Sequence, residues 1–117
     1  MEMLIAVIDE PDHTEEILAG FLELGITGAT LIGSEGMGRV LSQDGPVFAG
    51  LQSLISRSRP RNQTLFSVIE DPDKVDQAID LIESVCGRFT SPSTGIVFTV
   101  PVNRVVGLAT RLEDAGD

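Results

Sequence analysis

The chain has 117 residues, enough for one small domain that would bury roughly two-thirds of its unfolded surface. Its 18 acidic and 8 basic residues give a formal net charge of −10. That balance argues against nonspecific binding to nucleic acid or anionic membranes, because such binding depends on clustered Lys and Arg. No apolar run approaches the ~20 residues of a membrane-spanning helix, and the apolar start at residues 3–8 is too short for a signal peptide. We therefore expect a globular, cytoplasmic protein that binds no nucleic acid and does not insert into a membrane.

The first half of the chain predicts a strand, a helix and a second strand. Residues 3–8 form a continuous apolar run, which is typical of a strand covered on at least one face. Apolar residues then recur at helical spacing over residues 12–24. Gly25 follows at the point where a helix C-terminus favours a residue with positive φ. Residues 29–34 complete this half as a short strand.

The second half repeats this pattern. Residues 64–69 are rich in β-forming side chains, and residues 71–73 (Asp-Pro-Asp) supply a helix cap and a helix start. A second amphipathic helix follows and ends at Gly87. Residues 96–102 form a final strand of Val, Ile, Phe and Thr, with a proline near its end.

The strand–helix–strand order therefore occurs twice, which predicts an α+β, ferredoxin-like βαββαβ sandwich in a single domain over residues 1–117. Helices would cover one face of the sheet and leave the other apolar face in need of a partner. A homo-oligomer is the natural way to cover that face.

Residues 40–62 form an unusually long connection between the two halves. Loops above ~12–15 residues are uncommon in compact domains and are often functional or disordered. This connection contains an apolar cluster over residues 47–55, followed by the basic residues Arg57, Arg59 and Arg61. It either folds onto its own domain as a helical turn or docks on a partner through its apolar cluster and basic rim, and the sequence favours neither interpretation.

A glycine-flanked arginine follows the strand at residues 29–34. Gly36 and Gly38 relieve steric limits on the backbone where that strand ends. Arg39 adds a guanidinium suited to an anionic ligand, beside backbone that can approach the ligand closely. This pattern predicts a ligand site that also controls the long connection.

The chain resembles the nitrogen regulatory PII signalling proteins and their PII-like relatives in four segments, which are Ala6-Val7-Ile8, residues 24–30 (LGITGAT), Gly36-Met37-Gly38-Arg39 and residues 95–106 (GIVFTVPVNRVV). The resemblance implies a homotrimer of ferredoxin-like subunits without enzymatic turnover. It also implies that ATP or ADP binds in clefts between subunits, often with 2-oxoglutarate sensed through ATP-bound magnesium. Residues 40–62 would then be the effector-docking loop, and the regulated partner would be a membrane transporter or a metabolic enzyme.

Nine residues match positions that line the nucleotide cleft of this family, namely Val7, Gly28, Thr30, Gly36, Met37, Gly38, Arg39, Val68 and Gly95. Basic positions of the family do not match, because Ile96 stands in place of a lysine and Gly107 and Ala109 stand in place of two phosphate-binding arginines. Val40 replaces a glutamine that helps to hold magnesium-ATP and 2-oxoglutarate. Each lost cation forfeits charge-assisted bonds worth ~1.5–3 kcal/mol. These departures favour a less charged ligand such as AMP, a cyclic dinucleotide or another metabolite, and they leave magnesium open.

Two other functions remain open from the sequence. One is a constitutive trimeric interaction module whose nucleotide site has decayed. The other, less favoured, is a CutA-like metal-binding protein of the same fold. His13, the only histidine, has no Cys or His at ligand spacing, so we expect it to be an exposed surface residue. A single histidine with no stated role also supports no catalytic triad, so we expect no enzyme.

Overall fold

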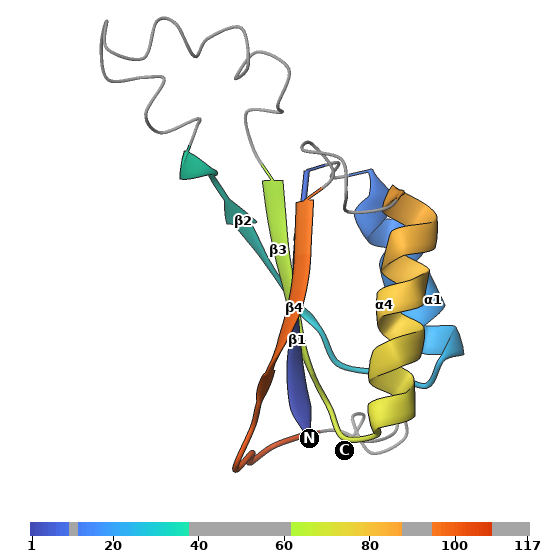
Figure 1. The fold of residues 1–117 in the computed structure, drawn as a ribbon, viewed down its shortest axis with the longest axis vertical. Helices are drawn as coiled ribbons and strands as arrows, with labels where there is room; N and C mark the ends of the chain where they lie inside the picture. Colours follow the sequence, from blue (N-terminus) through green and yellow to red (C-terminus); the bar gives the residue numbers. More distant parts are fainter. Residues whose placement is uncertain (10–11, 38–61, 88–94, 109–117) are drawn as a thin grey trace, which may run out of the picture.

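The computed structural model describes residues 1–9, 12–37, 62–87 and 95–108 (Figure 1). Six elements follow one another in the predicted order: β1 (Glu2–Ile8), α1 (His13–Glu23), β2 (Thr30–Ser34), β3 (Asn62–Ile69), α4 (Pro72–Cys86) and β4 (Gly95–Pro101). The predicted repetition of strand, helix and strand is confirmed. The predicted strand and helix boundaries differ from the structure by one or two residues, and the largest difference is at β3, which begins at Asn62. The long connection, predicted over residues 40–62, therefore cannot include Asn62. Its residues 40–61 lie outside the described part of the chain.

The four strands form one antiparallel sheet in the order β2-β3-β1-β4. The two strands of the first half are thus separated by β3, as the ferredoxin-like order requires. In the centre of the sheet Ala6 of β1 lies opposite Leu65 of β3 and Val97 of β4. Both helices cover the same face of this sheet (Figure 1). We call that face the inner face and the opposite one the outer face.

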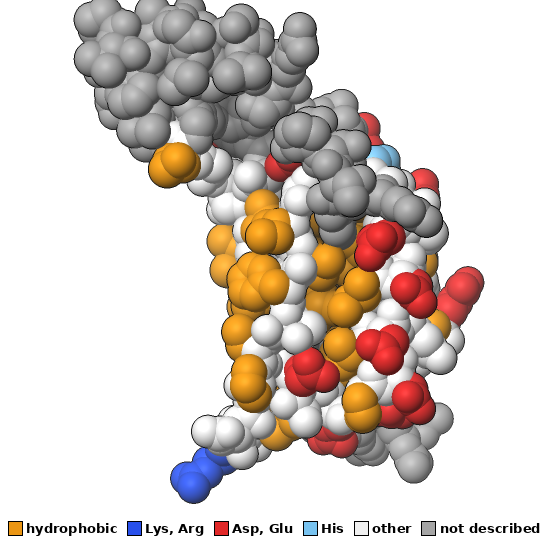
Figure 2. All heavy atoms as spheres, viewed as in Figure 1, with side chains coloured by type: hydrophobic (Ala, Val, Ile, Leu, Met, Phe, Trp, Pro, Cys, Tyr) orange, Lys and Arg blue, Asp and Glu red, His pale blue; other side chains and the backbone are white. Residues whose placement is uncertain are grey.

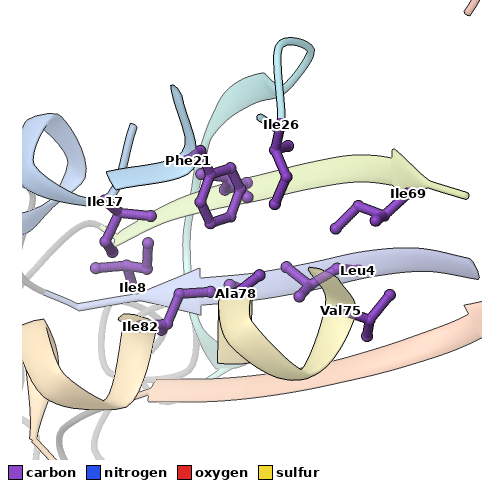
Figure 3. Close-up of a cluster of buried hydrophobic side chains, with 11 residues drawn as sticks. Leu4, Ile8, Ile17, Phe21, Ile26, Ile69, Val75, Ala78 and Ile82 are labelled. Atoms are coloured by element: carbon purple, nitrogen blue, oxygen red, sulfur yellow. The ribbon is translucent and has the colours of Figure 1, made fainter. Parts of the chain in front are cut away.

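Alternate residues of each strand enter the core, because successive strand side chains point to opposite faces. Leu4, Ala6 and Ile8 of β1 are all fully buried under the helices. The core contains eleven apolar residues from both helices, two strands and the turn after α1, and most of them are labelled in Figure 3: Leu4, Ala6, Ile8, Ile17, Phe21, Ile26, Leu65, Ile69, Val75, Ala78 and Ile82. The two helices approach closely at Gly20, where an added Cβ would lie 2.4 Å from Leu81 Cδ2.

The helix ends confirm the sequence signals. After α1 the amide of Gly25 donates to the Leu22 carbonyl at 3.0 Å, and the amide of Ile26 donates to the Phe21 carbonyl at 2.8 Å. This pair of bonds is a Schellman motif, and Gly25 supplies the positive φ of 83° that it needs. At the start of α4 the Asp71 carboxylate accepts from the Asp73 amide at 2.9 Å, as expected of a helix cap.

The outer face is apolar and has no cover within the described chain. Ile96 and Phe98 of β4 are 54% and 43% exposed, and Ile32 of β2 is 50% exposed. Figure 2 shows apolar side chains along the side of the sheet away from the helices, and acidic side chains over the helices. No helix of the described residues is long and apolar enough to cross a membrane.

Candidate functional site

The predicted cleft residues fall into two groups at opposite ends of the sheet. Val7 and Gly95 lie where β1 ends and β4 begins, since Ile8 pairs with Gly95 and Val7 pairs with Ile96. A Cβ added to Gly95 would lie only 2.0 Å from the Val7 carbonyl oxygen, and the φ of Gly95 is +117°. Only glycine permits this close backbone approach. The structure therefore joins these two predicted residues directly.

Gly36 and Met37 follow β2 at the same end of the sheet. The Ser34 hydroxyl lies against Asn62 Oδ1 and 2.8 Å from Thr64 Oγ1, which fixes the end of β2 to the start of β3. Beyond this anchor Met37 is 78% exposed. Two further predicted residues, Gly38 and Arg39, follow Met37 in sequence but lie outside the described residues. The glycine-flanked arginine therefore stays a prediction.

The second group contains Gly28, Thr30 and Val68 at the other end of the sheet. Thr30 pairs with Phe66 of β3, and Val68 follows two residues later on the same face. Ser67 is 2% exposed, and its hydroxyl donates to the Gly28 carbonyl at 2.5 Å. This buried bond fixes the turn between α1 and β2 against β3. Ser67 is not among the residues predicted from the sequence.

A cavity opens beside this second group. Its volume is about 150 Å³, and its lining comes from the turn after α1, the end of β3, the start of α4 and the segment after β4: Gly25, Ile26, Thr27, Gly28, Val68, Ile69, Glu70, Asp71, Lys74 and Leu108. Two of the predicted residues, Gly28 and Val68, are thus brought together in one cavity.

The two groups are separated along the sheet by four residues of β3. Val7 lies opposite Thr64, whereas Val68 lies opposite Met3. At 3.3–3.4 Å per residue, this separation is about 13 Å. Within one chain, the predicted residues therefore lie in two groups about 13 Å apart along the sheet.

The charged residues of the cavity are not among the residues predicted from the sequence. Glu70 went unnoticed, Asp71 was recognised only as a helix cap, and Lys74 was counted only in the net charge. One signal was present, because Lys74 is the only lysine in the chain. At the opposite end of the sheet, Ile96 is an exposed apolar side chain. Gly107 directly precedes the cavity residue Leu108, and no atom lies within 4 Å of its added Cβ.

The metal-binding interpretation gains no support from the described residues. None of their His, Cys, Asp and Glu side chains form a group of three or more that could hold a metal ion. The expectation that His13 is exposed was wrong. Its side chain is half-buried at the start of α1, and its Nδ1 atom has no hydrogen-bond partner in the described structure.

Comparison with known proteins agrees with the resemblance noted in the sequence. A family model described as nitrogen regulatory protein P-II matches residues 1–111, which is nearly the whole chain. A search of the curated proteins gave no match. The match and the observed element order lead to one conclusion. This chain belongs to the nitrogen regulatory protein P-II family of signalling proteins.

Proposed function

We propose that this protein is a homotrimeric sensor without enzymatic turnover. It binds an adenine nucleotide in clefts between its subunits and regulates a membrane transporter or a metabolic enzyme through residues 40–62. One observation carries this proposal: Val7, Thr30 and Val68 all belong to the outer face of the sheet, which is apolar and which no other described part of the chain covers. Covering this face with another subunit would enclose these residues in a cleft.

The apolar surface explains why more copies of the chain are the expected cover. The outer face presents Met3, Ile5 and Val7 on β1, and β3 and β4 continue it with Phe66, Val68, Ile96, Phe98 and Val100. Monomeric soluble proteins rarely expose a contiguous apolar patch of this kind. A closed symmetric oligomer covers it without leaving a free edge for further association.

The charges favour a ligand with few phosphates. Ile96 and Gly107 supply no cation at positions where the family has basic residues, and Ala109 is uncharged as well. AMP and cyclic nucleotides therefore fit this chain better than ATP and ADP, with or without magnesium. The effect of the ligand on residues 40–62 requires only that the ligand bind two states of the trimer unequally.

Thermal unfolding and calorimetry test this proposal with ATP, ADP, AMP, cyclic AMP and cyclic di-AMP, each with and without magnesium and 2-oxoglutarate. A ligand at ~100-fold its dissociation constant stabilises the folded state by about 2.7 kcal/mol. The proposal predicts such stabilisation for at least one nucleotide, with a changed rate of tryptic cleavage at Arg57, Arg59 or Arg61.

The lost cations also favour the second candidate function, a constitutive interaction module with a decayed nucleotide site. That candidate predicts a trimer in which no nucleotide changes either the thermal unfolding or the tryptic cleavage. If no nucleotide in the panel changes the thermal unfolding or the tryptic cleavage, the sensor function is overturned and the interaction module is favoured.

A further inference from the structure

Lys74 has an unusual position for the only lysine of a strongly acidic chain. It belongs to the first turn of α4, is half-buried and lines the cavity beside Gly28 and Val68. Its ammonium extends across Gly25, where an added Cβ would lie 2.8 Å from Nζ. Within the described ranges, no hydrogen bond or ion pair engages this ammonium.

This position is not explained by an ion pair. Glu70 and Asp71 line the same cavity, yet neither is paired with Lys74. The ammonium does lie beside the C-terminal end of α1, whose last turn has no basic residue, and a cation is favourable there. This placement leaves donors of the ammonium without acceptors in the described chain, and they are available to a ligand.

The cavity is suited to an uncharged polar group rather than to phosphates. Glu70, Asp71 and Lys74 are all lining residues, so a phosphate bound beside Lys74 would also lie near two acidic residues. A cavity of about 150 Å³ has room for roughly five waters at about 30 Å³ each, and protein cavities of this volume bind one aromatic ring, which is the scale of a ring of a nucleobase. Ile26, Val68 and Leu108 add apolar contacts for a flat ring.

We propose that Lys74 binds the base of the nucleotide and donates a hydrogen bond to one of its ring nitrogens. The inference rests on the proposed function. It assigns a contact with the base to Lys74, which is not one of the nine cleft residues predicted from the sequence. A lysine ammonium only donates, so it needs an acceptor such as the N1, N3 or N7 atom of adenine. Carboxylates such as those of the lining residues Glu70 and Asp71 only accept hydrogen bonds, and the exocyclic amine of adenine is a donor that matches them.

Calorimetry with AMP, ADP and their 1-deaza, 3-deaza and 7-deaza analogues tests this proposal directly. Each analogue replaces one ring nitrogen by a carbon. We expect one analogue to bind the wild type roughly tenfold or more weakly than its parent nucleotide, because a hydrogen bond to a charged donor is lost. In Lys74→Met, which keeps the apolar stem, parent and analogue should bind equally. Lys74→Arg, which keeps the charge and the donors, should restore part of the discrimination.

The outcomes separate the two proposals. If the wild type binds AMP or ADP and Lys74→Met shows the same analogue profile, the role of Lys74 is overturned and the sensor stands. If the wild type binds neither AMP nor ADP, two proposals are overturned. One is that Lys74 contacts their base, and the other is that the protein senses these two nucleotides. A general structural defect of Lys74→Met would weaken parent and analogue alike, and would not remove the difference between them.

A second measurement needs no substitution. Reductive methylation with ¹³C-formaldehyde labels Lys74 and the N-terminal amine, keeps both positive charges and gives one lysine signal by NMR. As AMP is added up to saturation, the Lys74 signal should change in proportion to the fraction of sites occupied. An unshifted signal in protein that calorimetry shows to bind AMP would contradict a contact with the base.

Discussion

The two faces of the sheet differ in how far the described part of one chain buries their apolar side chains. On the inner face Leu4, Ile8 and Leu65 are fully buried by α1 and α4. On the outer face Phe98 and Ile96 keep about half of their surface exposed, although they are as apolar as the core. The inner face therefore holds the core of the fold, whereas the outer face is the surface at which we propose that another subunit and a ligand bind.

The largest expected effect is on the free energy of unfolding, and it should differ between substitutions of two neighbouring residues of β1. Leu4 faces the core and Ile5 faces outward. Leu4→Ala should lower the free energy of unfolding by about 2–5 kcal/mol at every protein concentration, because it leaves a cavity. Ile5→Ala should have an effect that varies with protein concentration, because its contacts depend on association. Urea unfolding at several concentrations checks both, and equal, concentration-independent losses would contradict the distinction.

Ile96→Lys tests whether the uncharged side chain at position 96 weakens the binding of phosphates to the outer face. A lysine here restores a charge-assisted bond worth about 1.5–3 kcal/mol, so ATP should bind roughly tenfold or more tightly than to the wild type. Gln77→Lys adds the same charge on the exposed side of α4 and serves as the control. Equal affinities of the two variants in calorimetry would argue that position 96 does not contact the phosphates.

Gly95→Ala tests the close contact between β4 and β1. The positive φ alone costs about 1–3 kcal/mol, and the new Cβ would meet the Val7 carbonyl oxygen. We expect a lower urea midpoint and faster amide exchange at the start of β4. Gly28→Ala is the matched control among the candidate site glycines, since no atom lies within 4 Å of its added Cβ. A Gly95→Ala variant as stable as Gly28→Ala would contradict the contact.

Much of the fold could be predicted from local pattern. The glycine stops at Gly25 and Gly87 and the Asp71 cap depend on a few neighbouring residues, and the structure confirms all three. The start of β3 was missed because Asn62 and Gln63 are polar. Their place in the strand is set by pairing with Ser34 and Ile8, which lie far away in sequence.

The candidate site was less predictable because tertiary contacts assemble it. The resemblance identified Gly28 and Val68, which the structure brings into one cavity. Ser67 and Lys74 are polar residues in ordinary strand and helix patterns, so no local signal marks them as parts of a site. Their roles follow only when the turn after α1 packs against β3 and the first turn of α4.

The central claim is that the outer sheet face joins copies of this chain, and sedimentation equilibrium of the wild type and two variants tests it most directly. Phe98→Asp places a charge on the outer face, and Leu22→Asp places one on an exposed apolar residue of α1. The account predicts a wild-type mass three times that of the 12.5 kDa chain, a trimer for Leu22→Asp and a monomer for Phe98→Asp. A monomeric wild type, or a Phe98→Asp variant that still forms trimers as stable as those of Leu22→Asp, would contradict it.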